Sequence, residues 1–322
     1  MSVSFPKAVP FAWGVGAPVS VSVPDEGVIN HTWLIDTVDD CYALRRYAKG
    51  SRGAIERVHD LIAYVADNGL PAVAPLITID GDTLVEHDGW FYALFLHARG
   101  EQVPRNQLTV HQARPMGETL ARLHHTLSDV PRRGFPSRDA PLDTDRTVQD
   151  IDMLLDHIAA LSQPLEADLW AQNRLRSRRD WLLAHSERTF PDISSFPRQV
   201  THGDFHESNL FFEGDAVTAI LDWDRVEIAP RAFEIVRTMH ISLQLDPVLC
   251  GPFLSAYRGH KSMENQDLQG IVGWYESMRA HDLWLYRTLY RDGNERVRRF
   301  VRPGPFLPFG TAWSELLSDW PV

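Results

Sequence analysis

Three polar residues between positions 204 and 222 have the types and the spacing that phosphoryl transfer requires. Asn209 follows Asp204 by five positions, and Asp222 follows Asn209 by thirteen. In such reactions one carboxylate accepts the proton of the attacking hydroxyl, while an amide and a second carboxylate hold Mg²⁺ against the phosphates. Mg²⁺ prefers oxygen ligands and takes only one or two of them from side chains. The spacing therefore predicts a magnesium-dependent phosphotransfer site.

The segment THGDFHESNLFF at 201–212 permits two other interpretations. His202, Asp204 and His206 could bind a transition metal, because imidazole and carboxylate together suit Zn²⁺. The polar residues could also form a solvated loop without any chemistry. Under either interpretation the positions of the later asparagine and aspartate would be coincidental, so phosphoryl transfer accounts for more of the sequence.

The composition is that of a globular protein with an acidic balance. Of 322 residues, 44% are hydrophobic and 23% are charged, and the formal net charge is −11. This balance argues against nucleic-acid binding, which requires a basic face to neutralise phosphates. Two distant cysteines, Cys41 and Cys250, predict reduced thiols in a cytoplasmic protein. We find no signal peptide and no apolar run that could span a membrane, so we expect no membrane partner.

The first hundred residues have the pattern of β-strands around one helix. Strand-like runs lie at 31–37, 41–47, 76–79, 83–87 and 90–96. Between them, the segment 51–70 places apolar residues at helical spacing on one face, namely Ile55, Val58, Ile62 and Val65. These patterns predict a small sheet that carries one helix.

Helical patterns dominate after about residue 105, at 113–130, 147–188 and 231–290. Among them, short strands on either side of Gly214 form a predicted hairpin that would bring Asn209 and Asp222 side by side.

We therefore predict an α+β fold with two lobes. A β-rich lobe covers 1–96, a hinge covers 97–102, and a mainly helical lobe covers 103–322. A hinge between two lobes would leave a cleft, and ligands bind in clefts.

The motifs resemble those of a known superfamily. Its signature is His-Gly-Asp, four residues, Asn, and then Ile-Asp-Trp/Phe-Asp. This sequence has His202-Gly203-Asp204, Asn209 and Leu221-Asp222-Trp223-Asp224. It thus resembles the aminoglycoside phosphotransferase, choline kinase and homoserine kinase superfamily, the small-molecule relatives of protein kinases. The resemblance implies a protein-kinase-like fold with a small antiparallel β-lobe and a large helical lobe.

Weaker matches extend over most of the chain, at 27–36, 42–47, 94–101, 117–127 and 229–237. In the last of these, Glu234 stands where the family usually has an aspartate.

The resemblance implies a role for each residue of the double motif. Asp204 orients or deprotonates the acceptor hydroxyl. Asn209 and Asp222 bind Mg²⁺, and Asp224 assists them. His202 stabilises the catalytic loop rather than taking part in the chemistry.

The resemblance also implies that the β-lobe binds the nucleotide. Gly27 and Asn30 lie in the segment that resembles the nucleotide loop. The backbone groups of Leu96 and Ala98, in the segment that resembles the hinge, would contact adenine.

Two features depart from the family pattern. Arg45 stands where the family often has a lysine that contacts the α- and β-phosphates, and Glu56 on the first helix would be its ion-pair partner. A guanidinium keeps the charge but is not an equivalent donor. The frequent Pro-Gly before the motif asparagine is replaced by Glu207-Ser208.

The late helices form the acceptor side of the cleft in this family. We accordingly expect Glu276, His281 or Asp282 to line an acceptor pocket, with ordinary core packing of this helix as the alternative.

Together these features predict an ATP- and Mg²⁺-dependent kinase that transfers the γ-phosphate to a hydroxyl of a small molecule. A homoserine-like amino acid, an amino alcohol, a sugar or an aminoglycoside would each be consistent with the fold. The run at 70–95 also resembles a bacterial stress-response kinase that phosphorylates Ser and Thr of proteins. A non-catalytic nucleotide-binding module is the third alternative.

Overall fold

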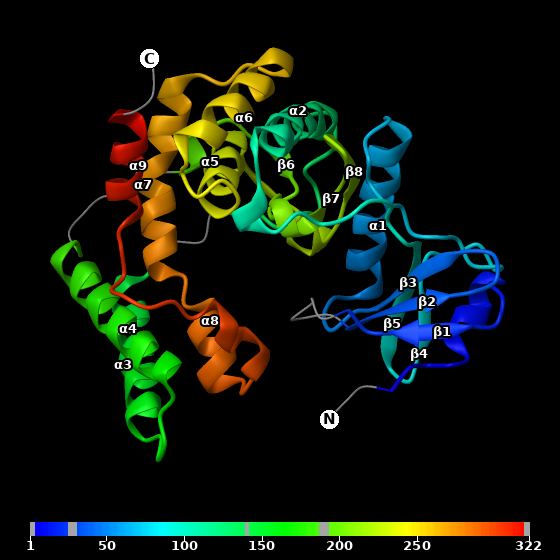
Figure 1. Cartoon of the computed structure of the whole chain (residues 1–322), viewed down its shortest axis with the longest axis horizontal. Helices are drawn as coiled ribbons and strands as arrows, with labels where there is room; N and C mark the ends of the chain where they lie inside the picture. Colours follow the sequence, from blue (N-terminus) through cyan, green and yellow to red (C-terminus); the bar gives the residue numbers. More distant parts are fainter. Residues whose placement is uncertain (1–3, 25–30, 139–141, 187–192, 319–322) are drawn as a thin grey trace. The chain divides into compact units, whose positions relative to one another are not determined.

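The computed structural model describes residues 4–24, 31–138, 142–186 and 193–318 (Figure 1). The chain divides into two compact units. The first comprises Met1–Ser137, Arg198–Glu234 and Thr238–Ser262, and the second comprises Arg138–Pro197, Ile235–Arg237 and Met263–Val322. The sheet and the predicted catalytic motif both belong to the first unit.

The first unit contains a five-stranded antiparallel sheet in the order β1-β2-β3-β5-β4. Its strands are β1 (Ser20–Ser22), β2 (His31–Asp36), β3 (Cys41–Arg46), β4 (Val85–His87) and β5 (Trp90–Leu96), and helix α1 (Arg52–Asp67) follows β3. Thr37 closes the β2–β3 hairpin, because its backbone N–H and its hydroxyl both donate to the carbonyl of Asp40. The predicted small sheet with one helix is therefore confirmed.

Alternating side chains give this sheet one apolar face. Trp33 and Ile35 of β2, Leu44 of β3 and Leu94 of β5 are buried together in one cluster. Burying each such side chain contributes roughly 1.5–3 kcal/mol to folding. The sheet is thereby held rigidly enough to fix the direction of the polar side chains on β3.

One predicted strand is absent from the sheet. The residues at 76–79 form a loop, in which the hydroxyl of Thr78 accepts from the backbone N–H of Asp82. Leu76 packs against the core of the sheet and its N–H donates to the carbonyl of Leu94 in β5, whereas Ile77 and Ile79 are exposed.

Helix α1 buries a histidine together with its apolar face. His59 is 1% exposed, and its two ring nitrogens lie 2.8 Å from the hydroxyls of Tyr47 and Thr83. Burial lowers the pKa of His59 to about 4, and the nearby positive charge of Arg45 acts in the same direction. The imidazole is therefore neutral at pH 7.

Acidification from pH 7 to pH 5 is expected to lower the free energy of unfolding through His59. Its folded pKa lies below the ordinary value of 6.5, so the unfolded chain binds more protons in this window and stability falls with the pH. Linkage gives a loss of about 2 kcal/mol from this one group. Urea unfolding at both pH values measures the loss, and His59→Asn should reduce it by about that amount.

The exposed His111 provides the control for this measurement. His111→Asn should leave the pH dependence as it is in the wild type. An equal reduction in both variants would contradict the assignment to His59.

The remainder of the first unit combines helices with two short antiparallel sheets of two strands each. The helices are α2 (Val110–Leu127), α5 (Arg231–Ile241) and α6 (Pro247–His260), and the sheets are β6 (Arg198–Thr201) with β9 (Glu227–Pro230) and β7 (Leu210–Glu213) with β8 (Ala216–Ile220). The middle of α5, at Ile235–Arg237, belongs to the second unit. Gly117 lets α2 approach α6 closely, because a Cβ at this position would lie 2.0 Å from the carbonyl oxygen of Phe253.

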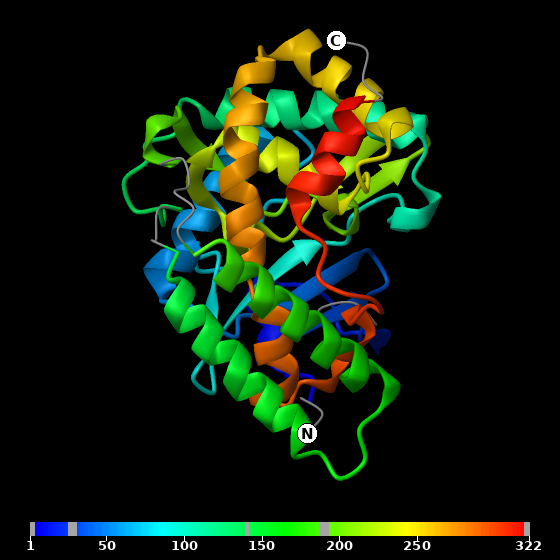
Figure 2. The same ribbon diagram turned by 90° about the vertical axis from the view of Figure 1, so that its left-hand side faces the viewer.

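The second unit is helical. Its helices are α3 (Thr144–Ala159), α4 (Glu166–Ala184), α7 (Asn265–His281), α8 (Trp284–Tyr286) and α9 (Phe309–Ser318). Helices α3 and α4 lie side by side, as do α7 and α9 (Figure 1; Figure 2). The helical pattern predicted over 147–188 is interrupted between α3 and α4, where Pro164 lacks the N–H that a continuous helix would use.

Short 3-10 segments cover Val9–Trp13, Arg105–Gln107, Ile193–Ser195, Glu207–Asn209, Trp223–Arg225 and Glu295–Phe300, and a π-helical turn covers Arg287–Arg291. Among the helices of the described ranges, none has both the length and the apolar character needed to cross a membrane. The predicted succession of a β-rich part and a mainly helical part is confirmed. The predicted boundaries at 96 and 102 stay predictions.

Candidate active site

The β7–β8 hairpin brings two of the predicted metal ligands together. Leu210 pairs with Ile220, and the N–H of Leu221 donates to the carbonyl of Asn209 at 2.8 Å. Asp222 follows with φ at 58°, a left-handed conformation that few non-glycine residues adopt. The chain turns sharply there and places the Asp222 side chain at the end of the hairpin, on the same end as Asn209.

His202 connects the Asp204 loop to this hairpin. Its Nε2 donates to the carbonyl of Leu221 at 3.0 Å, and its Nδ1 accepts from the backbone N–H of Asp204 at 3.2 Å. Burial lowers the pKa of His202, which keeps the ring in the neutral form that this pair of hydrogen bonds requires. Because both ring nitrogens make hydrogen bonds, His202 has no lone pair left for Zn²⁺. Among the described residues, no group of three or more His, Cys, Asp and Glu side chains could hold a metal ion.

Gly203 allows the loop to pass very close to the segment after β8. Its φ is +77°, and a Cβ at this position would lie 2.0 Å from the carbonyl oxygen of Arg225. Its N–H donates to Oε1 of Glu234 at 2.5 Å. Only glycine satisfies both the backbone conformation and the close approach.

Gly203→Ala is expected to lower the free energy of unfolding by about 3 kcal/mol or more, because both the left-handed backbone and the overlap with a carbonyl must be relieved. Gly214→Ala is the matched control, since Gly214 has φ at +60° but no atom within 4 Å of the position that an added methyl group would take. That variant should cost only about 1 kcal/mol. Equal losses in the two variants, measured by urea unfolding, would show that the close approach contributes nothing.

A buried polar network holds the backbone of the loop that carries Asp204. Glu234 accepts from the N–H of Gly203 and, through Oε2, from Nε2 of His124 at 2.8 Å, and His124 Nδ1 lies 2.9 Å from the hydroxyl of Tyr257. Burial lowers the pKa of His124. Burial opposes ionisation of Glu234, but the hydrogen bonds from His124 and Gly203 lower its pKa overall. A buried carboxylate thus holds the backbone beside Asp204.

This role of His124 is not among the sequence predictions. A signal is present, because His124 and Glu234 both lie in segments that resemble family motifs. The contact between them has no signature in either segment.

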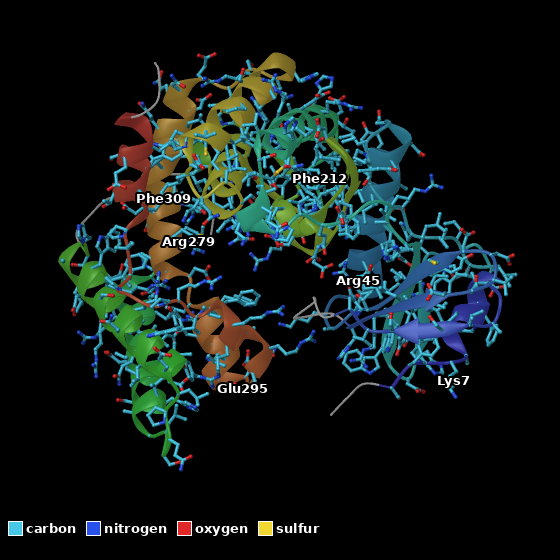
Figure 3. The ribbon with its side chains drawn as sticks, in the orientation of Figure 1. Lys7, Arg45, Phe212, Arg279, Glu295 and Phe309 are labelled. Carbon is cyan, nitrogen blue, oxygen red and sulfur yellow. The ribbon has the colours of Figure 1, made fainter. Side chains whose placement is uncertain are left out.

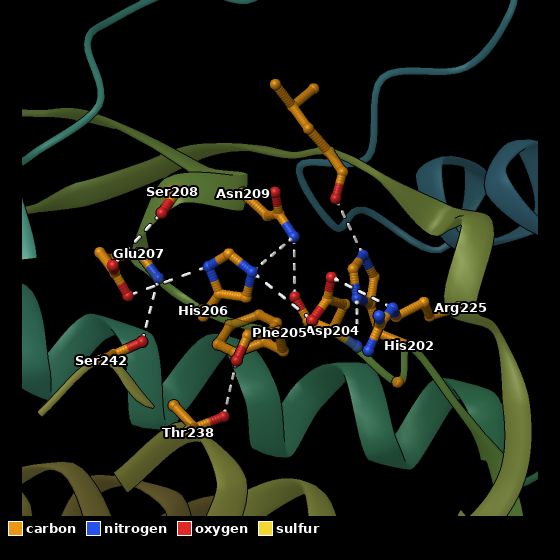
Figure 4. Close-up of polar contacts among 12 residues, drawn as sticks. His202, Asp204, Phe205, His206, Glu207, Ser208, Asn209, Arg225, Thr238 and Ser242 are labelled. Carbon is orange, nitrogen blue, oxygen red and sulfur yellow. Dashed lines mark hydrogen bonds and ion pairs between the residues drawn. The ribbon is translucent and has the colours of Figure 1, made fainter. Parts of the chain in front are cut away.

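Three further contacts hold the catalytic loop, as the close-up shows (Figure 4). The hydroxyl of Thr238 donates to the carbonyl of Phe205 at 2.8 Å, and the N–H of Glu207 donates to the hydroxyl of Ser242 at 3.0 Å. Asn209 Nδ2 donates to the carbonyl of Asp204 at 2.9 Å. The loop is therefore fixed independently of the Asp204 carboxylate.

The Asp204 carboxylate lies between the ring of His206 and the guanidinium of Arg225. Its Oδ1 is 3.5 Å from Nε2 of His206, and its Oδ2 is 3.9 Å from Nε of Arg225. The side chain is 14% exposed. It is accessible enough to meet a substrate hydroxyl, yet shielded enough for the charge of Arg225 to act on it.

Arg45 connects the sheet to both aspartates of the second motif. It extends from β3 (Figure 3), and its Nη2 lies 2.9 Å from Asp222 Oδ1 and 2.7 Å from Asp224 Oδ2. Burial alone would lower the pKa of Arg45, but Asp224 and Asp222 raise it above the ordinary value. The guanidinium therefore stays charged beside the two carboxylates.

The ion pair expected between Arg45 and Glu56 is not formed within the described part of the chain. Glu56 instead accepts from Arg52, one helical turn earlier, at 3.0 Å. The short i,i+4 separation makes that local pair easy to form, while Asp222 and Asp224 satisfy Arg45. The place of Glu56 in the nucleotide site stays a prediction.

The remaining predicted nucleotide contacts are only partly visible. Gly27 and Asn30 lie outside the described residues. Leu96 is the last residue of β5 and is exposed, and Ala98 is half-buried two positions later. Beyond it, Glu101 exchanges backbone hydrogen bonds with Phe212 at 2.9 and 2.8 Å, which fixes the end of the predicted hinge to the hairpin that carries Asn209.

The three predicted acceptor residues lie in the second unit, where each has a structural contact. Glu276 is buried and accepts from the N–H of Gly310 at 2.7 Å. Nδ1 of His281 lies 2.8 Å from the carbonyl oxygen of Ser277, and Asp282 accepts from Arg279 at 3.2 Å. Their role in acceptor binding stays a prediction.

The chemistry of the donor set suits a hard divalent cation. Asn209 offers an amide oxygen, and Asp222 and Asp224 offer carboxylate oxygens, whose side chains are 46% and 37% exposed. Oxygen ligands of this kind, few in number and open to water and phosphate, are those that Mg²⁺ prefers.

Comparison with known proteins points to one family. The family model described as "Phosphotransferase enzyme family" matches residues 20–267. The homoserine kinase of Bradyrhizobium sp. (strain ORS 278) is 29% identical over 215 residues, which cover 66% of this chain and 60% of that enzyme. The match thus spans less than two thirds of that relative.

Solved structures share the fold at low identity. Spectinomycin phosphotransferase in complex with ADP and spectinomycin has a TM-score of 0.65 and 15% identity, over 89% of this chain and 85% of that one. Amicoumacin kinase in complex with AMP-PNP, Ca²⁺ and Ami has a TM-score of 0.58 and 14% identity, over 90% and 91%. These matches confirm the predicted protein-kinase-like fold.

Proposed function

Because the chain belongs to the phosphotransferase enzyme family, we propose that it transfers the γ-phosphate of ATP to a hydroxyl of a small molecule, with Mg²⁺ as cofactor. Family membership confirms the predicted class of enzyme, a kinase. One observation supports the proposal above the others. Asp204, Asn209 and Asp222 converge on one loop and hairpin whose backbone is held by buried hydrogen bonds.

In this proposal Asp204 orients the acceptor hydroxyl and accepts its proton. The carboxylate is suited to this role, because it lies on a fixed loop, is largely buried and faces the guanidinium of Arg225. Fixed geometry of this kind supplies much of the rate enhancement in phosphoryl transfer.

Asn209, Asp222 and Asp224 are the residues that would hold Mg²⁺. When bound, the ion supplies positive charge that neutralises the phosphates during transfer. Arg45 now neutralises the two aspartates from the β3 side. Its other N–H donors make no ion pair with Glu56, and we assign them to the phosphates of the nucleotide.

For the acceptor we propose a small hydroxyl compound of the homoserine, amino alcohol, sugar or aminoglycoside type. The similarity to a homoserine kinase and to a spectinomycin phosphotransferase supports this class. Nucleotide complexes of two structural relatives support an adenine nucleotide as donor.

A coupled ADP-release assay across an acceptor panel tests the proposal. The panel contains hydroxy amino acids, amino alcohols, sugars, aminoglycosides and a generic protein substrate, each with ATP and Mg²⁺. Turnover with a small molecule supports the proposal. Turnover with the protein substrate alone would identify a protein kinase instead, and nucleotide binding without any turnover would identify a non-catalytic module.

A further inference from the structure

Two buried polar atoms in the catalytic loop face each other without making a hydrogen bond. Nδ1 of His206 lies 3.9 Å from Oε2 of Glu207, and neither atom has a hydrogen-bond partner among the described residues. The Glu207 side chain is 3% exposed, so water does not replace the missing partner. A buried donor or acceptor without a partner is costly, and a movement of about 1 Å would bring this pair within hydrogen-bond distance.

The other carboxylate oxygen of Glu207 is already occupied. Oε1 accepts from Arg105 Nε at 2.8 Å and Nη2 at 2.7 Å, and from the hydroxyl of Ser208 at 3.2 Å. Arg105 therefore fixes the direction of the carboxylate. Oε2 is left as a pure acceptor that faces the histidine ring.

The far side of the ring faces the residues of the proposed chemistry. Nε2 of His206 lies 3.2 Å from Nδ2 of Asn209 and 3.5 Å from Oδ1 of Asp204, and the amide nitrogen also donates to the carbonyl of Asp204 at 2.9 Å. The amide oxygen of Asn209 points away from both partners (Figure 4). Both N–H groups of the amide are thus used to hold its oxygen outward, where it can serve as a ligand.

This arrangement works with only one tautomer of His206. Nε2 can accept from Asn209 only if the ring proton is on Nδ1. An acceptor carboxylate beside Nδ1 favours that tautomer, as outer partners of histidines in metal sites do. If the proton were on Nε2, that N–H would face the amide N–H of Asn209 at 3.2 Å, and its acceptor would be Oδ1 of Asp204 at the longer distance of 3.5 Å. The Asn209 amide would then lose its second restraint.

We propose that Glu207 is a positioning residue that holds His206 in the Nδ1–H tautomer, so that His206 in turn holds the amide oxygen of Asn209 toward the metal. This inference rests on the proposed function. It is particular to this chain, because Glu207-Ser208 replaces the Pro-Gly that resembling sequences often have.

Glu207→Gln tests the proposal without changing the shape of the side chain. Its single oxygen is expected to stay with Arg105, so that its NH₂ group faces Nδ1 and drives the ring proton to Nε2. Nitrogen-15 NMR of ring-labelled protein, with His206 assigned by difference from His206→Gln, should show the Nδ1–H tautomer in the wild type and the other tautomer in the variant. The affinity for Mn²⁺ in the presence of ADP, followed by EPR, should fall about tenfold.

Steady-state kinetics should show a lower kcat with an unchanged KM for the acceptor, which a general loosening of the fold would not produce. Ser208→Ala is the matched control, because it removes a neighbouring contact of the same carboxylate but leaves Oε2 in place. It should keep the wild-type tautomer and Mn²⁺ affinity.

Two results would overturn the inference: an Nε2–H tautomer in the wild type, or an unchanged Mn²⁺ affinity in Glu207→Gln. Either can occur while the wild type binds Mn²⁺–ADP and phosphorylates an acceptor, so the proposed function would survive. A wild type that binds no Mn²⁺–ADP at all would overturn both.

Discussion

Replacing Asp204 with asparagine is expected to lower kcat by about two to four orders of magnitude while nucleotide affinity changes little. An amide of the same shape cannot accept the hydroxyl proton, and general base catalysis contributes a factor of this size. Single-turnover transfer from ATP measures the loss. Titration with a fluorescent ATP analogue in the presence of Mg²⁺ measures the affinity.

The loop is expected to survive this substitution, because its geometry does not depend on the carboxylate. The backbone of Asp204 donates to His202 and accepts from Asn209, and the preceding glycine is held by Glu234. Asp215→Asn is the matched control, since Asp215 lies exposed at the β7–β8 turn and should tolerate the change. Turnover of Asp204→Asn within tenfold of the wild type would remove the assigned base.

The double motif could be predicted from the sequence because its geometry is local. Asn209 and Asp222 stand together at the open end of one antiparallel hairpin, and pairing of the intervening strands fixes their separation. The apolar periodicity of α1 and the turn between β2 and β3 are local features of the same kind, and the structure confirms both.

The partners of the buried charges could not be predicted, because they depend on contacts between distant segments. Arg45 and Asp222 are 177 positions apart, and His124 and Glu234 are 110 apart. The family resemblance favoured Glu56 for Arg45, yet the arginine contacts the two aspartates that tertiary folding brings to the end of the hairpin. Pairing of this kind follows from the packed fold and leaves no periodic signal in either segment.

The second large effect is expected for Asp222→Asn, which should lower kcat/KM by about three orders of magnitude. An amide is a weaker ligand than a carboxylate, and loss of metal charge at the phosphates removes several kcal/mol of transition-state stabilisation. Asparagine tolerates the left-handed backbone of position 222 (φ 58°), so the turn after β8 should be kept. Isothermal titration with ADP, with and without Mg²⁺, should show that the variant has lost the metal-dependent part of its nucleotide affinity.

Asp224→Asn provides the comparison that separates metal binding from charge pairing. Both aspartates contact the same nitrogen of Arg45, at 2.9 and 2.7 Å, so either substitution removes one ion pair from that arginine. If pairing with Arg45 were their main contribution, the two variants would lose activity equally. Since only Asp222 directly follows the strand end that is bonded to Asn209, we expect Asp224→Asn to cost no more than about tenfold in kcat/KM. A larger loss at Asp224 than at Asp222 would reverse the assignment of the principal metal ligand.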